Sequence, residues 1–274
     1  MLDARRRACL EAMGIELWRV RGEGNRLAEN APSHTEPPGQ GSETGGGSLA
    51  PQRPLPTRTH PDQAPAVANL EPAAPQRATT VLGPEPSGFS WEELEVAVKT
   101  CTACDLHETR TQTVFGVGDR STSLMVVGEA PGADEDRQGE PFVGRAGQLL
   151  NAMLQAIGFA REQVYIANII KCRPPGNRDP HIEETAACQP FLHRQIALIQ
   201  PRLILSVGRI SAHNLLGTEE AVGRLRGRVH RFDPGDIPLI VTYHPAYLLR
   251  RPQEKSKAWQ DLQAAYRTLG GRMV

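Results

Sequence analysis

The chain has 274 residues, and its 31 lysines and arginines are balanced by 31 aspartates and glutamates, so the formal net charge is zero. This balance neither favours nor excludes nucleic-acid binding. No apolar run approaches the ~18 residues that cross a membrane, and the N-terminus lacks the apolar core and cleavage site of a secretory signal. We therefore expect a soluble, cytoplasmic protein with no membrane partner.

The first 88 residues form two segments of different composition. Residues 1–21 carry apolar side chains at roughly helical spacing, which predicts a short amphipathic helix. Such a helix cannot bury its apolar stripe alone, so it docks on the rest of the chain or binds a replication or repair protein. Residues 22–88 hold twelve of the 23 prolines and no Phe, Trp or Tyr. This composition cannot offset the entropy of ordering, and we expect a disordered linker.

The remaining segment, residues 89–274, alternates predicted helices and strands. Ser90 and Glu93 have the spacing of a capping box at the start of a first helix, and Asp179-Pro180 resembles a later helix start. Four apolar runs predict buried strands at 124–127, 164–170, 203–207 and 239–243. Further helices are predicted at 144–157, 189–199 (interrupted at Pro190), 209–216 and 255–268. This alternation predicts an α/β fold with a mostly parallel sheet covered by helices on both faces.

Four of the five cysteines have the spacing of a metal site. Cys101 and Cys104 form a C-x2-C pair, and Cys172 and Cys188 follow much later in the chain. A disulfide framework is not expected in a chain of this size without a secretory signal. Four thiolates suit either zinc or an iron–sulfur cluster, and the spacing does not distinguish the two. Four unrelated buried thiols are the remaining alternative.

Three polar turns follow predicted strands, with the sequences GEAPG, NIIKCRPP and HPAYLLR. Because the carboxyl ends of parallel strands share one edge of the sheet, where ligands bind in open α/β folds, we expect the turns to form one site. The site would contain an aromatic ring (Phe142), an amide (Asn168), an imidazole (His244), carboxylates and arginines. These groups suit a flat heterocycle held beside a phosphate backbone.

The same motifs resemble those of the family 4 uracil-DNA glycosylases. GEAPG, GEPFVGRAGQLL, NIIKCRPPGNRDP and HPAYLLR occur in this order together with the four spaced cysteines, over about residues 90–268. The resemblance implies a three-layer α/β/α sandwich around a four-stranded, mainly parallel sheet. It also implies a [4Fe–4S] cluster on the four cysteines, in preference to zinc. The implied reaction is the removal of uracil from single- or double-stranded DNA, which leaves an abasic site.

The resemblance assigns roles to three side chains. Phe142 would stack on a uracil that is flipped out of the DNA. Asn168 would donate to uracil O4 and accept from N3–H, a pattern that cytosine reverses, so that the amide would reject cytosine. His244 would donate a hydrogen bond to O2 and stabilise the negative charge that develops as the glycosidic bond breaks.

The first motif departs from that of the better-known uracil-DNA glycosylases, which carry GQDPYH with an aspartate that positions water. Ala130 stands at the aspartate position, and the nearest carboxylate is Glu129. We expect Glu129 to activate water, and Glu135 to crowd the 5-position of uracil and so exclude thymine. Gly128, Ala130 and Pro131 would line the substrate pocket.

Arginines and leucines near the predicted site offer contacts with DNA. The cluster would be structural and would hold the loop after the second predicted strand against DNA. Leu248 and Leu249 would enter the gap left by the flipped base, or else they cover the core. Neighbouring arginines would hold phosphates. The predicted DNA-binding residues are Arg173, Asn177, Arg178, Leu248, Arg250 and Arg251.

The sequence indicates a monomeric, monofunctional glycosylase and leaves one other class of function open. No lysine lies in the motifs where Schiff-base lyase chemistry would need it, because Lys171 belongs with the predicted cluster loop. The absence of an aspartate at Ala130 keeps an alternative, in which the chain is a catalytically weak iron–sulfur module that binds nucleic acid.

Overall fold

A computed structural model of the chain describes residue 11 and residues 86–271. The predicted helix over 1–21 and linker over 22–88 lie outside these described residues, except for Glu11 and 86–88. The described part contains a six-stranded sheet in the order β1-β3-β2-β4-β6-β5. Its four central strands are parallel and coincide with the predicted ones. They are β2 (Leu124–Gly128), β3 (Tyr165–Asn168), β4 (Leu203–Val207) and β6 (Ile237–Thr242).

Two short antiparallel strands extend the sheet beyond the four that were predicted. β1 (Val117–Gly118) pairs with β3 at one edge, and β5 (Val229–Phe232) pairs with β6 at the other. β1 has two residues, and three of the four residues of β5 are exposed or half-buried. Neither strand therefore forms the apolar run by which a strand is found in a sequence. The fold class is confirmed, and the strand count is corrected from four to six.

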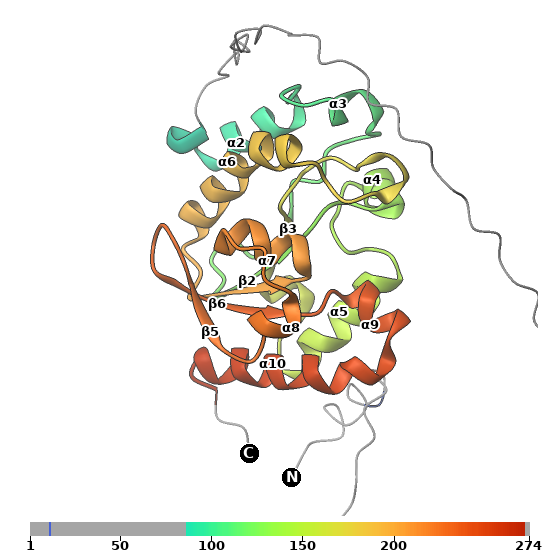
Figure 1. Ribbon diagram of the computed structural model, residues 1–274. Helices are drawn as coiled ribbons and strands as arrows, with labels where there is room; N and C mark the ends of the chain where they lie inside the picture. Colours follow the sequence, from blue (N-terminus) through green and yellow to red (C-terminus); the bar gives the residue numbers. More distant parts are fainter. Residues whose placement is uncertain (1–10, 12–85, 272–274) are drawn as a thin grey trace, which may run out of the picture. The chain divides into compact units, whose positions relative to one another are not determined.

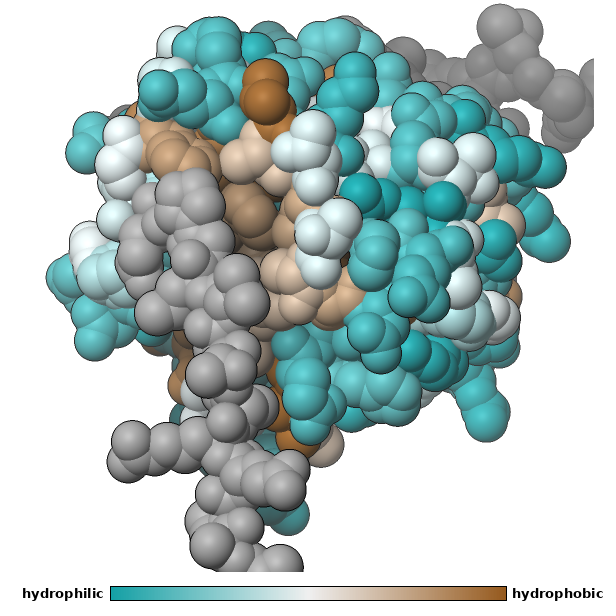
Figure 2. Space-filling view, turned by 90° about the horizontal axis from the view of Figure 1, so that it is seen from above, coloured by the Kyte–Doolittle hydropathy of each residue, from teal (hydrophilic) through white to brown (hydrophobic). Residues whose placement is uncertain are grey.

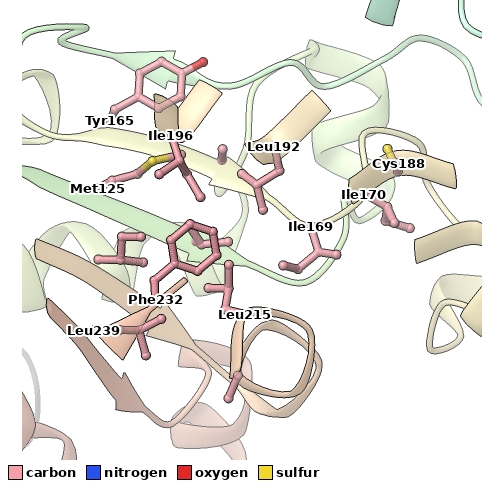
Figure 3. Packing of buried hydrophobic residues seen from close by; sticks show 14 of the residues in the cluster. Met125, Tyr165, Ile169, Ile170, Cys188, Leu192, Ile196, Leu215, Phe232 and Leu239 are labelled. Carbon is pink, nitrogen blue, oxygen red and sulfur yellow. The ribbon is translucent and has the colours of Figure 1, made fainter. Parts of the chain in front are cut away.

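Both faces of the sheet are buried under helices, which gives the predicted three layers. Alternate residues of a strand point to opposite faces. Val126 of β2 packs in a cluster with α5 (Arg145–Ala156), α9 (Pro245–Arg250) and α10 (Lys255–Thr268). Met125, its neighbour, packs with α6 (Ile182–Ile199) and α7 (Arg209–Leu216). Figure 3 shows this second cluster, with Leu192 and Ile196 of α6 close to Met125. Figure 1 shows α5 and α10 on the opposite side of the sheet from α6 and α2 (Trp91–Lys99).

The start and the continuity of α6 differ from the prediction. The helix begins after His181, whose N–H donates to the Glu184 carboxylate at 2.8 Å, and not at Asp179-Pro180. It also continues through Pro190. Proline removes the N–H that would bond to the Ala186 carbonyl, but both residues are exposed, so water can satisfy that carbonyl. The other short elements are η1 (Pro86–Gly88), α3 (Leu106–Thr109), α4 (Ala133–Gln138), η2 (Arg161–Gln163), η3 (Pro175–Asn177), α8 (Val222–Leu225) and η4 (Pro252–Glu254).

Some apolar side chains lie on the surface. Figure 2, which looks onto the end of the molecule where α2 and α6 lie in Figure 1, shows apolar residues surrounded by hydrophilic ones. Val96 of α2 and Ile182 of α6 are the most exposed large apolar residues in the described part, at 62% and 82%. Among the helices described, none is long and apolar enough to cross a membrane.

A buried carboxylate joins α10 to the end of β6. Asp261 of α10 is almost fully buried and accepts hydrogen bonds from Arg226 at 3.0 Å and from the Thr242 hydroxyl at 2.9 Å. Burial raises the pKa of Asp261, and the bonds from Arg226 and Thr242 oppose that rise. Because Thr242 is the last residue of β6, this network fixes the strand end from which the HPAYLLR motif continues.

We predict that Asp261→Ala lowers the free energy of unfolding by about 3–5 kcal/mol, because it leaves the guanidinium of Arg226 poorly solvated and without a charge partner. Arg226 is only 13% exposed. Urea denaturation followed by circular dichroism measures the change. Glu220→Ala is the matched control, since it breaks an exposed ion pair with Arg228, and it should cost less than about 1 kcal/mol. Equal losses in the two variants would contradict the assignment.

Candidate functional site

The turns after β2, β3 and β6 meet at the carboxyl edge of the parallel strands, as the sequence predicted. They line one pocket of about 840 Å³ together with the start of α7. Backbone hydrogen bonds join the first two turns, because the N–H groups of Ile169 and Ile170 donate to the carbonyls of Gly128 and Glu129 at 3.0 and 3.2 Å. Backbone hydrogen bonds alone therefore fix the first two predicted motifs relative to one another.

Gly128 ends β2 at the point where Phe142 and Asn168 converge. A Cβ atom at Gly128 would lie 2.4 Å from Asn168 Oδ1 and 2.6 Å from the Phe142 ring, so no larger residue fits without displacing them. Phe142 itself has φ of 55°, in the left-handed region. A Cβ at Gly147 would lie 1.8 Å from the Phe142 carbonyl oxygen. Two glycines thus allow the phenyl ring to lie against the amide of Asn168.

Asn168 has a buried, unsatisfied acceptor at the wall of the pocket. The residue is 2% exposed, and its Oδ1 is buried without a hydrogen-bond partner in the described part of the chain. Leaving a buried polar atom unpaired costs about 1–3 kcal/mol. Since Asn168 lines the pocket beside Phe142, a flat ligand that stacks on the ring and offers an N–H group would satisfy this atom.

Lys171 fixes the backbone of Asn168 through a hydrogen bond. Its side chain is buried, and Nζ donates to the backbone carbonyl of Asn168 at 3.0 Å and to Gln195 Oε1 at 2.7 Å. Gln195 donates in turn to the Tyr165 hydroxyl at 3.2 Å. Burial lowers the pKa of Lys171 to about 8, and the thiols of Cys188 and Cys172 oppose this shift. Lys171 lies with the cysteines, as predicted, and also contacts the residue that carries the unpaired acceptor.

His244 is a neutral hydrogen-bond donor at the same edge. It is the N-cap of α9, and its Nδ1 accepts from the Ala246 N–H at 3.1 Å. The ring proton therefore resides on Nε2. Burial lowers the pKa of His244 to about 4, and the charge of Arg250 adds to this effect. The centroids of the His244 and Phe142 rings are 5.6 Å apart, so the imidazole lies within reach of a base stacked on Phe142.

Glu129 can exchange a proton near neutral pH. Burial, together with the nearby carboxylate of Asp179, raises the pKa of Glu129 to about 7, although Arg209 opposes the rise. Arg209 bonds to Asp179 at 2.5 Å, which joins the loop after β3 to the start of α7 across the pocket. The sequence analysis did not assign Asp179 and Arg209 to the site. The only sequence feature that points to Asp179 is the NRDP sequence after Cys172, and nothing in that sequence shows that Arg209 bonds to Asp179.

Glu135 lines the pocket and also fixes two of its loops. One carboxylate oxygen accepts from the Gly132 N–H at 3.1 Å, and the other accepts from Val143 and Gly144 at 3.0 and 3.3 Å. Arg161 fixes the same segment, because it donates to the carbonyls of Pro141 and Phe142 at 2.6 and 3.3 Å. Arg161 was not among the predicted site residues, because it lies in an ordinary turn sequence before β3. Ala130 and Pro131 line the pocket as predicted.

The loop after β3 carries three of the predicted DNA-binding residues, and it is internally bonded. Arg178 donates to both carboxylate oxygens of Glu184, at 2.9 and 2.6 Å, and so ties the loop to α6. Arg173 donates to the side chain of Asn177 at 2.8 Å. Arg178 and Asn177 line the pocket, so the loop presents a fixed surface at the mouth of the pocket.

The α9 end of the site requires one correction. Leu248 is fully buried in the core, so its side chain does not reach a ligand at the surface, and its prediction as a DNA-binding residue is wrong. Leu249 is 36% exposed. Arg250 and Arg251 are exposed and form no ion pair within residues 86–271. The side chains of Leu248 and Leu249 differ in exposure because adjacent residues of a helix point in different directions.

The four predicted cysteine ligands come together in space. Cys101, Cys104, Cys172 and Cys188 are free thiols and line one small cavity. Figure 3 shows Cys188 beside Ile170, at the edge of the apolar cluster under α6. Hydrogen-bond donors face three of the sulfurs, because Ala103 N–H, an Arg110 guanidinium N–H and Lys171 N–H lie 3.5, 3.0 and 3.2 Å from Cys101, Cys172 and Cys188.

The chemistry of these thiols suits a metal-containing group. Burial raises the pKa values of Cys104, Cys172 and Cys188, the last to about 12, so the sulfurs stay protonated unless a metal displaces the protons. Within the described residues, no three His, Cys, Asp or Glu side chains converge closely enough to hold a single metal ion. Four cysteine sulfurs that line one cavity are a donor set that an iron–sulfur cluster uses.

The chain is similar in sequence to glycosylases of known type. Residues 115–263 match the family model described as "Uracil DNA glycosylase superfamily". A type-4 uracil-DNA glycosylase of Archaeoglobus fulgidus is 43% identical over 180 residues, which cover 64% of this chain and 90% of that protein. The corresponding protein of Thermotoga maritima is 47% identical over 154 residues, or 56% and 80% of the two chains.

A type-5 uracil-DNA glycosylase of Thermus thermophilus is less similar, at 30% identity over 149 residues, which cover 48% of this chain and 68% of that protein. The similarity to the type-4 proteins is greater both in identity and in the share of each chain that is covered. The resemblance found in the motifs is confirmed. The chain belongs to the uracil DNA glycosylase superfamily, and within it to the type-4 group.

Proposed function

We propose that the chain is a monofunctional DNA-repair glycosylase that hydrolyses the N-glycosidic bond of deoxyuridine in single- or double-stranded DNA and leaves an abasic site. The observation that carries this proposal is the unpaired Oδ1 of Asn168 next to the Phe142 ring. Uracil stacked on Phe142 would supply the missing donor through N3–H. Cytosine has a bare acceptor at N3, which would repel Oδ1 and leave it unpaired.

His244 would stabilise the leaving base. As the glycosidic bond breaks, negative charge develops on uracil, and the Nε2–H of His244 donates to O2 where that charge collects. Because its pKa lies near 4, the imidazole is neutral above that pH and donates without giving up its proton. The bond from Ala246 to Nδ1 keeps the ring in the tautomer that this role requires.

Glu129 would activate the water that attacks the sugar. With a pKa of about 7, a substantial fraction of Glu129 is ionised at neutral pH and can accept a proton from water. Glu135 would form a rigid wall near the 5-position of uracil, since backbone N–H groups hold both of its oxygens. Ala130 and Pro131 would complete the pocket around the base, and Gly128, which does not line it, would leave room for the Phe142 ring and the Asn168 amide.

DNA would lie across the mouth of this pocket. Arg250 and Arg251 are exposed and free of ion pairs within residues 86–271, so both can hold phosphates. Arg173, Asn177 and Arg178 would form the opposite side of the DNA path. Leu249, in place of Leu248, is the apolar residue positioned to fill the gap left by a flipped base.

Cys101, Cys104, Cys172 and Cys188 would hold a [4Fe–4S] cluster. The group supplies a structural cross-link when it is bound, because its ligands come from the segment before β1, the loop after β3 and helix α6. Free thiols of this kind persist in the reducing cytoplasm, where we propose that the protein acts. A monomeric state, and a replication or repair partner for residues 1–21, stay predictions.

Uracil release tests the proposed reaction. A labelled oligonucleotide with one deoxyuridine should lose uracil with the wild-type protein. Asn168→Ala and His244→Ala should each lower kcat/KM by at least about 100-fold, or about 2.7 kcal/mol of transition-state stabilisation. Asn214→Ala and His213→Ala, on α7 and outside the pocket lining, are matched controls and should act like wild type. Loss of less than threefold in both site variants would contradict the assignment.

The pH dependence tests Glu129. A carboxyl group that acts as a base must be ionised, so kcat/KM of the wild type should rise with pH through about 7 and then level off. Glu129→Gln should be slow and should lose this rise. A wild-type rate that falls as pH increases through this range, or a Gln variant with an unchanged profile, would contradict the role of Glu129 as a base.

Metal analysis tests the cofactor. Protein purified without oxygen should contain about four irons per chain and absorb near about 400 nm. Cys172→Ser should lose most of the iron and unfold at lower temperature. Cys9→Ser changes a cysteine outside the proposed ligand set and should leave the iron content and the unfolding temperature unchanged. Zinc in place of iron would contradict the assignment of an iron–sulfur cluster, and it would not bear on the proposed reaction.

A further inference from the structure

The pocket is larger than one flipped base requires. Its volume of about 840 Å³ lies in the upper part of the range of sites for ligands much bigger than a nucleobase. The groups that would read uracil account for only part of its lining. One further part of the wall is formed by the start of α8 with the residue before it, and by two tyrosines near the HPAYLLR motif. These residues are Ala221, Val222, Gly223, Tyr243 and Tyr247.

The two tyrosines form a supported aromatic pair. Their ring centroids are 5.1 Å apart and their planes are tilted by 34°. The guanidinium of Arg226 lies 5.8 Å from the Tyr243 centroid, and Asp261 holds Arg226 in place. Both tyrosines are half-buried, so their rings are neither core residues nor free to move in solvent. No step of the proposed reaction uses either ring.

Helix α9 sets the spacing between this pair and the uracil site. Tyr247 lies one turn after His244, and its N–H donates to the His244 carbonyl at 2.9 Å. Arg250 follows three residues later and lines the same pocket. The N-cap and the following turns of α9 thus carry the group for uracil O2, an aromatic face and a guanidinium. A base, its neighbouring base and the phosphate that joins them offer the matching partners on a DNA strand.

We propose that Tyr247, supported by Tyr243, is a stacking site for the nucleobase next to the flipped uracil on the same strand, with Arg250 at the intervening phosphate. The inference rests on the proposed function, because it requires uracil in the pocket. When uracil leaves the stack, its neighbour loses a stacking partner, and an aromatic side chain replaces that partner for any base type. The protein would therefore recognise a dinucleotide unit in which only uracil is identified.

Single-stranded oligonucleotides with one deoxyuridine test this site. In two of them a tetrahydrofuran spacer replaces the nucleoside on the 5′ or the 3′ side of the uracil. For the wild type, we expect one of the two replacements to lower kcat/KM about tenfold or more, as the loss of one stacked base does. Tyr247→Ala should release uracil from the oligonucleotide with the spacer and from the normal oligonucleotide at equal kcat/KM. Tyr247→Phe, which keeps the ring, should retain the preference.

A binding measurement with the wild-type protein avoids any variant that fails to fold. Uracil is replaced by 2′-fluoro-2′-deoxyuridine, which resists hydrolysis, and the neighbouring base by fluorescent 2-aminopurine. Stacking on Tyr247 should quench the fluorescence when the protein binds. The proposal is overturned if binding leaves the fluorescence unchanged on both sides, or if Tyr247→Ala keeps the preference for a flanking base. Failure of the proposed function would look different, because no oligonucleotide would then release uracil.

Discussion

The site depends on the close approach of three residues at the end of β2. Gly128 has no space for a Cβ because Asn168 Oδ1 and the Phe142 ring occupy that volume. The contact places an aromatic face and an amide acceptor against one another, and it leaves the acceptor without a partner in the described part of the chain. A folded protein can retain a buried, unpaired acceptor of this kind where a ligand supplies the missing donor. The neighbouring loops serve this arrangement, since Glu135 and Arg161 hold the segment that carries Phe142 and Lys171 holds Asn168.

Burial sets the protonation state of each polar group around this contact. It lowers the pKa of His244, which becomes a neutral donor, and raises that of Glu129, which becomes a base near neutrality. It also lowers the pKa of Lys171, whose bonded partners are neutral oxygens, although the neighbouring cysteines oppose that shift. One physical cause therefore shifts these pKa values in two directions, because protonated histidine and lysine are cations whereas a protonated carboxyl group is neutral. Lys171 also joins the cysteine cavity to the pocket, since it contacts both.

The sequence predicts what is local and periodic, and it fails where the outcome depends on distant contacts. The four parallel strands are apolar runs with turns after them, so the sheet edge and its motifs could be found before the structure was known. The edge strands β1 and β5 carry no such pattern. Arg161, Asp179 and Arg209 belong to the site only through folding, because their partners lie elsewhere in the chain or on its backbone. Leu248 and Leu249 are equivalent in sequence, and only the rotation of α9 buries the first and exposes the second.

The central claim is that the unpaired Oδ1 of Asn168 accepts a hydrogen bond from N3–H of uracil. Calorimetric titration with free uracil and with 3-methyluracil tests it most directly, because the methyl group removes that one donor. We expect wild-type protein to bind uracil at least about tenfold more tightly than 3-methyluracil, as one hydrogen bond to a buried group implies. We further expect Asn168→Ala to narrow this difference to the part caused by the bulk of the methyl group. Equal affinity of the wild type for the two bases would contradict the account.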